Sequence, residues 1–238
     1  MKRLGWSNSS ATASTISGAA ITSCWCSCRV ADTAALVPKV ALPCASRGPP
    51  PTAQARAGAS VAVIGLGGVG LASLLGARVA GARHIIAVDL SDAKLDLAKS
   101  LGVTHAFNAG NADSPERIRE VTAGGVEYAF ELAGSVRALD LAYKITRRGG
   151  TTVTAGLPPP TATFPLPAVN LVAEERTVKG SYIGTCVPSR DIPRYIELYR
   201  QGRLPVDRLM SGKLKLEDIN LGFDLLHEGK AVRQVVVF

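Results

Sequence analysis

The sequence predicts an α/β protein whose centre is a doubly wound parallel sheet with helices on both faces. From about Gly58 onward, short apolar runs rich in β-branched residues alternate with longer segments of helical character. Such alternation is typical of βαβ units, in which right-handed crossovers place helices on both faces of a parallel sheet. A glycine-rich stretch, VAVIGLGGVG at 61–70, joins the first apolar run directly to the first helical segment.

The strands of the predicted sheet are short apolar runs bounded by polar residues, glycine or proline. In chain order they are SVAVIG (60–65), HIIAVD (84–89), HAFN (105–108), VEYAFELAG (126–134), TTVTAGLPPP (151–160) and RTVKGSYIG (176–184). The helices between them begin near capping residues or proline and mostly stop at glycine. They are GVGLASLLGARVAG (68–81), DAKLDLAKSLG (92–102), SPERIREVTAGG (114–125) and VRALDLAYKITRRGG (136–150).

The rest of the chain, residues 185–238, is too short to build a second core alone. We expect it to be the closing part of another domain. Its predicted elements are a helix at about 188–200, extended pieces at LPVDRL (204–209) and GKLKL (212–216), a helix EDINLGFDLLHEG (217–229) and a final strand AVRQVVVF (231–238).

Residues 1–58 differ from the rest of the chain. They are rich in Pro, Ser, Ala and Thr with no sustained period, and RGPPPTAQARAG (47–58) has the composition of a linker. The sequence therefore predicts three parts: an irregular segment (1–58), the doubly wound α/β domain (59–184) and the closing part of another domain (185–238).

Composition excludes several classes of protein. The 238 residues are 47% hydrophobic and 19% charged, as in globular proteins. The formal charge is +8, but residues 1–58 carry +5 of it, and with 5% aromatic residues no basic stripe interleaves with aromatics, so we expect no nucleic-acid partner. No apolar run reaches the roughly 18 residues of a membrane span. The five cysteines form no disulfide framework, and we expect reduced thiols in a cytoplasmic protein.

The glycine-rich stretch has the spacing G-x-G-x-x-G, formed by Gly65, Gly67 and Gly70. After a strand and before a helix, the first glycine permits a tight turn and the second lets the backbone approach a pyrophosphate. The third allows the helix to pack closely on the strand, and the helix N-terminus attracts the phosphates. Asp89 ends the second predicted strand 19 residues after Gly70, where a carboxylate accepts ribose hydroxyls. Because it would also repel a 2′-phosphate, Asp89 favours NAD over NADP.

Two other interpretations of this stretch stay open from the residues alone. The turn could bind no ligand, or it could bind S-adenosylmethionine with the acid at the same strand end. The wider sequence then favours a dinucleotide. Residues 59–238 resemble the C-terminal half of zinc-dependent alcohol dehydrogenases of the medium-chain dehydrogenase/reductase family. The resemblance runs in order through GLGGVG, VDLSDAKL, FELAG, TAGLPPP, RTVKGSYIG and GFDLLHEGKAVRQVVVF.

The resemblance implies a Rossmann domain and a remnant of a GroES-like catalytic domain. It also implies cofactor contacts for residues beyond the three glycines and Asp89. Lys94 would reach the adenosine ribose, and Arg233 would pair with the pyrophosphate. The other implied contacts lie in the turn, after Asp89 and in the loops that follow later strands: Leu66, Gly68, Val69, Leu90, Leu132, Ala133, Ala155, Gly156, Leu157, Ser181 and Ile183. The strand at 176–184 resembles the edge through which family members form dimers, which implies a homodimer.

The zinc site of the family is not recognisable in this sequence. Its ligands are a Cys, the His of a G-H-E segment and a second Cys, whereas the only histidines here are His84, His105 and His227, which we interpret as structural or solvated. Cys24, Cys26 and Cys28 do not fit the family's structural zinc loop either. We therefore predict no catalytic and no metal-binding residues in this chain.

Residues 1–51 stand where much of a dehydrogenase would precede the cofactor domain. We interpret them as the product of a frameshifted, truncated or wrongly started reading frame, with a targeting peptide or a genuine segment as the other options. The predicted function is an NAD-dependent oxidoreductase, which transfers hydride between an alcohol or aldehyde and NAD but here retains mainly cofactor binding. The alternatives are a non-catalytic dinucleotide-binding or dimerisation module and a zinc-independent quinone-reductase-like enzyme. The sequence leaves the substrate, the activity and the oligomeric state open.

Overall fold

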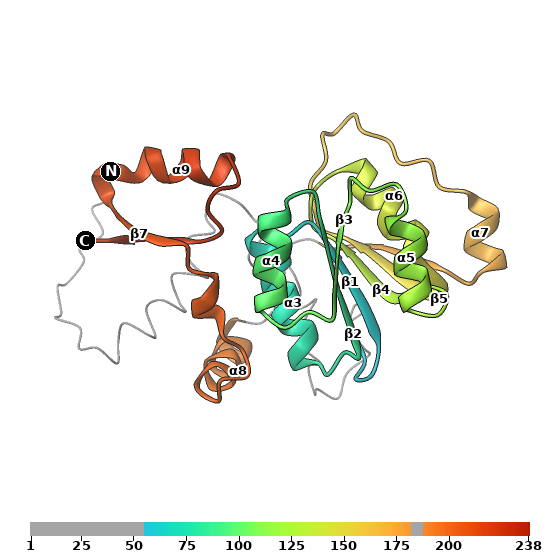
Figure 1. The fold of residues 1–238 in the computed structure, drawn as a ribbon, viewed down its shortest axis with the longest axis horizontal. Helices are drawn as coiled ribbons and strands as arrows, with labels where there is room; N and C mark the ends of the chain where they lie inside the picture. Colours follow the sequence, from blue (N-terminus) through green and yellow to red (C-terminus); the bar gives the residue numbers. More distant parts are fainter. Residues whose placement is uncertain (1–54, 182–187) are drawn as a thin grey trace.

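A six-stranded parallel sheet lies at the centre of the computed structural model, which describes residues 55–181 and 188–238 (Figure 1). Its strands are β1 (Ser60–Ile64), β2 (His84–Asp89), β3 (His105–Asn108), β4 (Val126–Glu131), β5 (Thr146–Thr154) and β6 (Thr177–Gly180). They lie in the order β3-β2-β1-β4-β5-β6. The chain therefore adds β2 and β3 on one side of β1 and β4 to β6 on its other side. This arrangement confirms the predicted doubly wound α/β fold.

Helices cover both faces of this sheet because alternate residues of β1 point to opposite faces. Val61 and Val63 belong to a core with residues of α3 (Gly68–Val79) and α4 (Asp92–Ser100). Ala62 and Ile64 belong to a second core with residues of α5 (Ser114–Val121) and α6 (Val136–Ile145). Figure 1 shows the two pairs of helices on opposite sides of the strands. Each fully buried Val, Leu or Ile contributes roughly 1.5–3 kcal/mol, so these two cores hold the sheet in place.

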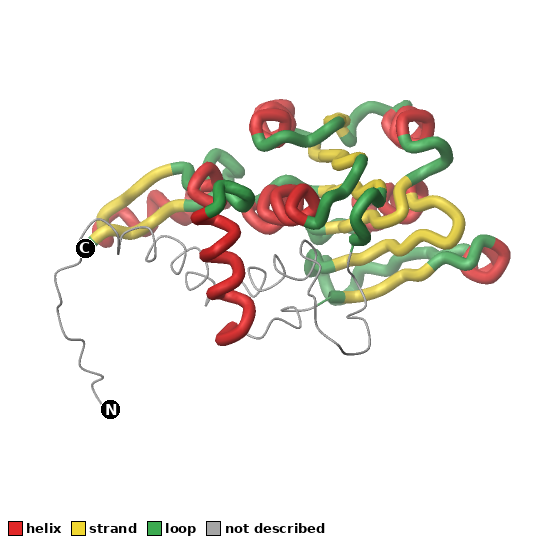
Figure 2. Tube along the Cα trace, turned by 90° about the horizontal axis from the view of Figure 1, so that it is seen from below, coloured by secondary structure: helices red, strands yellow, loops and turns green. Residues whose placement is uncertain are grey.

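The segment after residue 187 begins against the sheet domain and then extends away from it (Figures 1 and 2). Its elements are α8 (Pro188–Arg200), η3 (Val206–Leu209), β7 (Gly212–Lys215), η4 (Leu216–Asp218), α9 (Ile219–His227) and β8 (Gln234–Val237). Tyr195, Leu204 and Leu209 are buried in the core on the α3 face. β7 and β8 form a separate two-stranded parallel sheet. The first part of this segment therefore completes the core of the sheet domain.

Two predicted elements are wrong in detail. The helix predicted at 136–150 ends at Ile145, and Thr146 begins β5 because it pairs with Val126 of β4. The buried hydroxyls of Thr146 and Thr152 then bond at 2.8 Å across a register shift in β5. The extended piece predicted at 204–209 contains instead the 3₁₀ turn η3. Its turn bonds run from Arg208 N–H to the Pro205 carbonyl and from Met210 N–H to the Asp207 carbonyl.

One helix of the structure has no counterpart in the sequence prediction. The short α7 (Ala168–Ala173) lies between β5 and β6 and has no buried residue. Two of its side chains, Val169 and Val172, are exposed. Across 55–181 and 188–238, no helix is long and apolar enough to cross a membrane.

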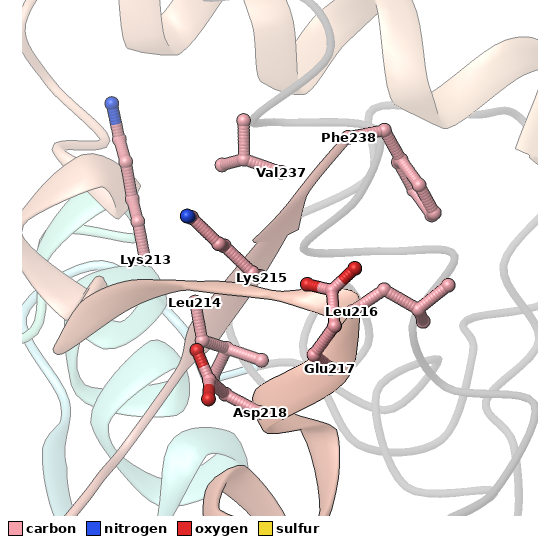
Figure 3. A pocket seen from close by; sticks show the side chains of 8 residues that line it. All are labelled: Lys213, Leu214, Lys215, Leu216, Glu217, Asp218, Val237 and Phe238. Atoms are coloured by element: carbon pink, nitrogen blue, oxygen red, sulfur yellow. The ribbon is translucent and has the colours of Figure 1, made fainter.

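The outer part of the C-terminal segment exposes apolar side chains. Phe223 on α9 is 50% exposed and Phe238 is 98% exposed. A hollow of about 760 Å³ lies between β7, η4 and the end of β8 (Figure 3). Its lining combines apolar with charged side chains: Lys213, Leu214, Lys215, Leu216, Glu217, Asp218, Val237 and Phe238. None of these residues belongs to the predicted cofactor contacts.

Candidate functional site

The glycine-rich turn between β1 and α3 has the geometry that its spacing predicts. Gly65 has φ +92°, a conformation that favours glycine, and its N–H donates to the Val88 carbonyl at 2.9 Å. A Cβ on Gly65 would lie 2.7 Å from the Ala133 amide nitrogen, and a Cβ on Gly70 would lie 1.9 Å from the Gly65 carbonyl oxygen. Both positions therefore require glycine for steric reasons, and the second brings the helix close to the strand.

The second glycine of the motif is open to solvent. Gly67 is exposed, and a Cβ built on it would meet nothing within 4 Å. It is the N-cap of α3, where no side chain caps the helix, and the Leu71 N–H donates to its carbonyl at 3.0 Å. A helix N-terminus with free amides and a partial positive charge is a general anion site, so this turn fits a phosphate.

A guanidinium from the far end of the chain lies at the same helix terminus. A Cβ on Gly68 would lie 2.8 Å from Arg233 Nε, so the arginine passes directly over this glycine. Ser211 fixes the backbone of Arg233: its Oγ accepts the Arg233 N–H at 3.0 Å, and its N–H donates to the Arg233 carbonyl at 2.6 Å. Arg233, which the family resemblance implies as a cofactor contact, therefore lies beside the glycine motif. Ser211 was not predicted from the sequence.

Asp89 lies at the carboxyl end of β2, beside the turn. Its Oδ2 accepts the Leu66 N–H at 2.6 Å and its Oδ1 accepts the Ser91 N–H at 2.9 Å. These two bonds fix the orientation of the carboxylate and leave further lone pairs on both oxygens. Leu90 next to it is exposed. The arrangement fits the ribose contact that the sequence predicts for this position.

Three other residues predicted at this end of the site lie in different surroundings. Leu66 is fully buried and Val69 is half-buried, so they support the turn from within. Lys94 on α4 is half-buried, and its Nζ lies 3.5 Å from the Cβ position of Gly229 in the C-terminal segment. Its predicted contact with a ribose stays a prediction.

The loops after β4 and β5 meet at the same edge of the sheet. Leu132 N–H donates to the Ile64 carbonyl at 2.8 Å. A Cβ on Gly156 would lie 2.1 Å from the Gly134 amide nitrogen, so the two loops touch through their backbones. Of the other residues predicted there, Ala133 and Leu157 are exposed and Ala155 is buried.

Two further cofactor contacts are predicted after β6, and only one of them lies among the described residues. Ser181 follows β6, and its N–H donates to the Thr154 carbonyl at 2.9 Å, which places it beside the loop after β5. Ile183 lies outside the described residues.

Sequence reasoning missed the most heavily bonded carboxylate at this edge. Glu131 is 1% exposed and ends β4. Its Oε1 accepts the N–H groups of the next loop, those of Ala133 at 2.8 Å, Gly134 at 2.6 Å and Ser135 at 3.3 Å. Its Oε2 accepts the Thr154 hydroxyl of β5 at 2.8 Å. The signal in the sequence was an acid inside the apolar run VEYAFELAG, because an unpaired charge is rarely buried.

The described residues do not fit a zinc ion. They contain no group of three or more His, Cys, Asp or Glu side chains that could hold a metal, and the five cysteines lie outside the described ranges. His84 and His105 lie side by side at the starts of β2 and β3, with ring centroids 5.9 Å apart. Burial, followed by the positive charge of Arg83 and by His105, lowers the pKa of His84. These two histidines lie at the strand end opposite to the glycine turn, and His227 ends α9.

Known proteins are similar to this chain in fold and in sequence. The family model for zinc-binding dehydrogenases matches residues 68–201. Alcohol dehydrogenase 1 from Trifolium repens is 36% identical over 187 residues, which covers 77% of this chain and 49% of that protein. S-(hydroxymethyl)glutathione dehydrogenase from Paracoccus denitrificans is 36% identical over 195 residues, covering 79% and 52%.

Solved structures agree with these relatives. Benzyl alcohol dehydrogenase from Acinetobacter calcoaceticus matches with a TM-score of 0.73 and 32% identity, covering 76% of this chain and 50% of that one. An alcohol dehydrogenase zinc-binding domain protein from Burkholderia ambifaria matches with a TM-score of 0.73 and 36% identity, covering 76% and 49%. The chain thus spans about half the length of the relatives it matches. It belongs to the zinc-binding dehydrogenase family and corresponds to the C-terminal half of a zinc-type alcohol dehydrogenase.

Proposed function

We propose that this chain binds NAD across the carboxyl edge of its sheet. The observation that carries the proposal is the convergence of three groups from distant parts of the chain: the open amide end of α3 at Gly67, the fixed carboxylate of Asp89, and the guanidinium of Arg233. Together they offer what a dinucleotide requires, namely donors and positive charge for the pyrophosphate and an acceptor for a ribose.

The strand order supports one direction for the bound dinucleotide. β2 with Asp89 lies on one side of β1, and β4 and β5 lie on the other. With the pyrophosphate over the turn after β1, the adenosine would lie over the end of β2. The nicotinamide would then lie near the loops after β4 and β5, where Leu132, Ala133, Ala155, Gly156 and Leu157 are predicted contacts.

The reaction class that we propose for this chain is taken from its family. The relatives are oxidoreductases, and we propose that this chain retains their cofactor binding and that hydride transfer between an alcohol or aldehyde and NAD is its reaction class. Bound NAD would supply the hydride acceptor, and Gly67, Asp89 and Arg233 would bind and orient it. We derive no step through zinc, because the described residues offer no set of ligands for it. The cytoplasmic location stays a prediction.

Titration of the purified chain with NADH and with NADPH, followed by nicotinamide fluorescence, tests the proposal. We expect NADH to bind more tightly than NADPH. In an Asp89→Asn variant the ratio of the NADPH Kd to the NADH Kd should fall by about tenfold or more, since a hydrogen bond to a charged group contributes roughly 1.5–3 kcal/mol. Asp92→Asn is the matched control, because it removes an equal charge from an exposed neighbour. Folded protein that binds neither nucleotide, or an equal change of the NADH/NADPH preference in both variants, contradicts the proposal.

A second proposal is self-association through β6. This strand ends the sheet, so its outer edge has no neighbouring strand among the described residues. An open edge is a template for pairing with another chain, and a copy of the same edge is one such partner. Sedimentation velocity should find a dimer, and substitution of the exposed Thr177 by Lys should shift it toward the monomer. A wild-type chain that sediments only as a monomer contradicts this assignment.

A further inference from the structure

Glu131 is a buried acid whose role the cofactor contacts above do not account for. It is 1% exposed, and its hydrogen-bond partners are three backbone amides and one hydroxyl, all uncharged. Burying a carboxylate is costly unless such donors surround it. A fold that only needed to stabilise β4 would meet this need with an apolar residue, as it does at the preceding Phe130, which is fully buried.

The bonds of Glu131 join two loops that are far apart in the sequence. Oε1 gathers the amides of Ala133 and Gly134 in the loop after β4, and Oε2 holds the hydroxyl of Thr154, the last residue of β5. The next backbone bonds continue the link, because the Ala155 N–H donates to the Glu131 carbonyl at 3.0 Å. One side chain therefore sets the position of both loops.

The same network reaches the glycine turn. The Cβ position of Gly65 lies 2.8 Å from Ala133 Cβ, and that of Gly156 lies 2.1 Å from the Gly134 nitrogen. The turn after β1 thus touches the loop after β4, and the loop after β4 touches the loop after β5, along one edge of the sheet. Because a Cβ fits at neither glycine, the contact surface has little freedom to adjust. Glu131 lies beneath it, within 3.1 Å of the Cβ position of Gly156.

We propose that Glu131 is a positioning residue for the nicotinamide half of the cofactor. It acts by holding the loops 132–135 and 155–157 as one surface, with Thr154 as its second anchor. This inference rests on the proposed binding of NAD across β1. It assigns Glu131 no contact with the cofactor, and it separates the two halves of the site: Asp89 serves the adenosine end, whereas Glu131 serves the nicotinamide end.

Two ligands separate this role from a general contribution to folding. NADH carries both halves of the dinucleotide, whereas ADP-ribose lacks the nicotinamide. Loss of fold stability weakens both ligands alike, but misplaced loops weaken NADH alone. The measured quantity is the ratio of the Kd for NADH to the Kd for ADP-ribose, obtained by calorimetry on the full chain.

The main variants are Glu131→Ala and Thr154→Val. We expect each to raise the Kd ratio by about tenfold, which corresponds to roughly 1.4 kcal/mol. Thr154→Ser keeps the hydroxyl and should restore the wild-type ratio. Glu127→Ala is the matched control: it lies on the same strand β4, but its carboxylate bonds the Ser60 N–H at 2.7 Å at the opposite strand end. It should lower the melting temperature and leave the ratio unchanged.

An unchanged ratio in folded Thr154→Val and Glu131→Ala overturns the inference while the proposed function stands. If Glu131→Ala does not fold, Thr154→Val and its serine counterpart decide the question alone. If wild-type protein binds ADP-ribose and NADH with equal affinity, the nicotinamide half has no site and the inference also fails. A wild-type chain that binds neither ligand overturns the proposed function itself.

Discussion

The third glycine of the turn provides the sharpest test of the site geometry. In a Gly70→Ala variant the new Cβ would start 1.9 Å from the Gly65 carbonyl oxygen, whereas such contacts are essentially never shorter than 3.0 Å. Strand and helix must therefore separate by roughly 1 Å in a region that is fully buried. The clash is with backbone, which cannot rotate away as a side chain can.

The size of the effect follows from two opposing contributions. Overpacking of a core costs about 1–3 kcal/mol, and a backbone clash belongs at the upper end of that range. Alanine in place of glycine within a helix returns at most about 1 kcal/mol. The net loss is about 2 kcal/mol, which lowers the melting temperature of a chain of this size by roughly 4–8 °C.

A second variant separates stability from binding. Gly67 has an ordinary φ of −73°, and a Cβ there meets nothing within 4 Å. Gly67→Ala should therefore melt close to the wild-type temperature, since replacing a glycine N-cap by alanine costs only a few tenths of a kcal/mol or slightly more. Its methyl group would nevertheless stand where the pyrophosphate approaches, so the Kd for NADH should rise.

Thermal melting followed by circular dichroism and fluorescence titration with NADH measure the two effects on both variants. Gly70→Ala with an unshifted melting temperature would refute the packing argument. Gly67→Ala with wild-type NADH affinity would refute the idea that backbone at this position must be approached closely.

Two further predictions concern other parts of the sheet. Because the pKa of His84 is lowered from 6.5 by burial, Arg83 and His105, the folded state binds fewer protons than the unfolded state, and stability present above pH 6.5 is lost as the pH falls through this value. His84→Gln should flatten the fall in melting temperature between about pH 7 and 5, and an unchanged slope would argue against this linkage. Thr146→Val leaves the buried Thr152 hydroxyl without its partner at 2.8 Å and should cost about 1–3 kcal/mol in chemical denaturation. The double substitution by Val should recover part of that loss, and a fully additive loss would contradict the pairing.

The fold could be predicted from the sequence where pattern and local rules agree. The first strand, the turn and the first helix were predicted because glycines, apolar runs and the helix start all occur in register in VAVIGLGGVG. The end of α6 could not, because TRR continues a helical pattern, whereas the strand begins there through the pairing of Thr146 with Val126 of β4. The short α7 carries no buried face and hence no periodicity to detect.

The candidate site divides in the same way. The positions of Gly65, Gly70 and Asp89 around the turn could be predicted because they depend on spacing along one βαβ unit. Ser211 could not, since its partner Arg233 lies in a distant segment and leaves no local pattern. Glu131 stands out in the sequence only as an acid in an apolar run, and its link to Thr154 of β5 leaves no local pattern. Arg233 was found only through the resemblance to a family, because nothing near it in the sequence points to Gly68.

The contact between Arg233 and the start of α3 has a consequence for the order of assembly. During synthesis the turn, Asp89 and the whole six-stranded sheet leave the ribosome before Ser211 and Arg233 do. A sheet that folds early therefore presents the proposed anion site without its arginine, because Arg233 is made later in the C-terminal segment. A dinucleotide that depends on this guanidinium would stabilise the completed chain but not the chain still being synthesised. The supply of cofactor would therefore affect the stability of the folded protein more than its folding during synthesis.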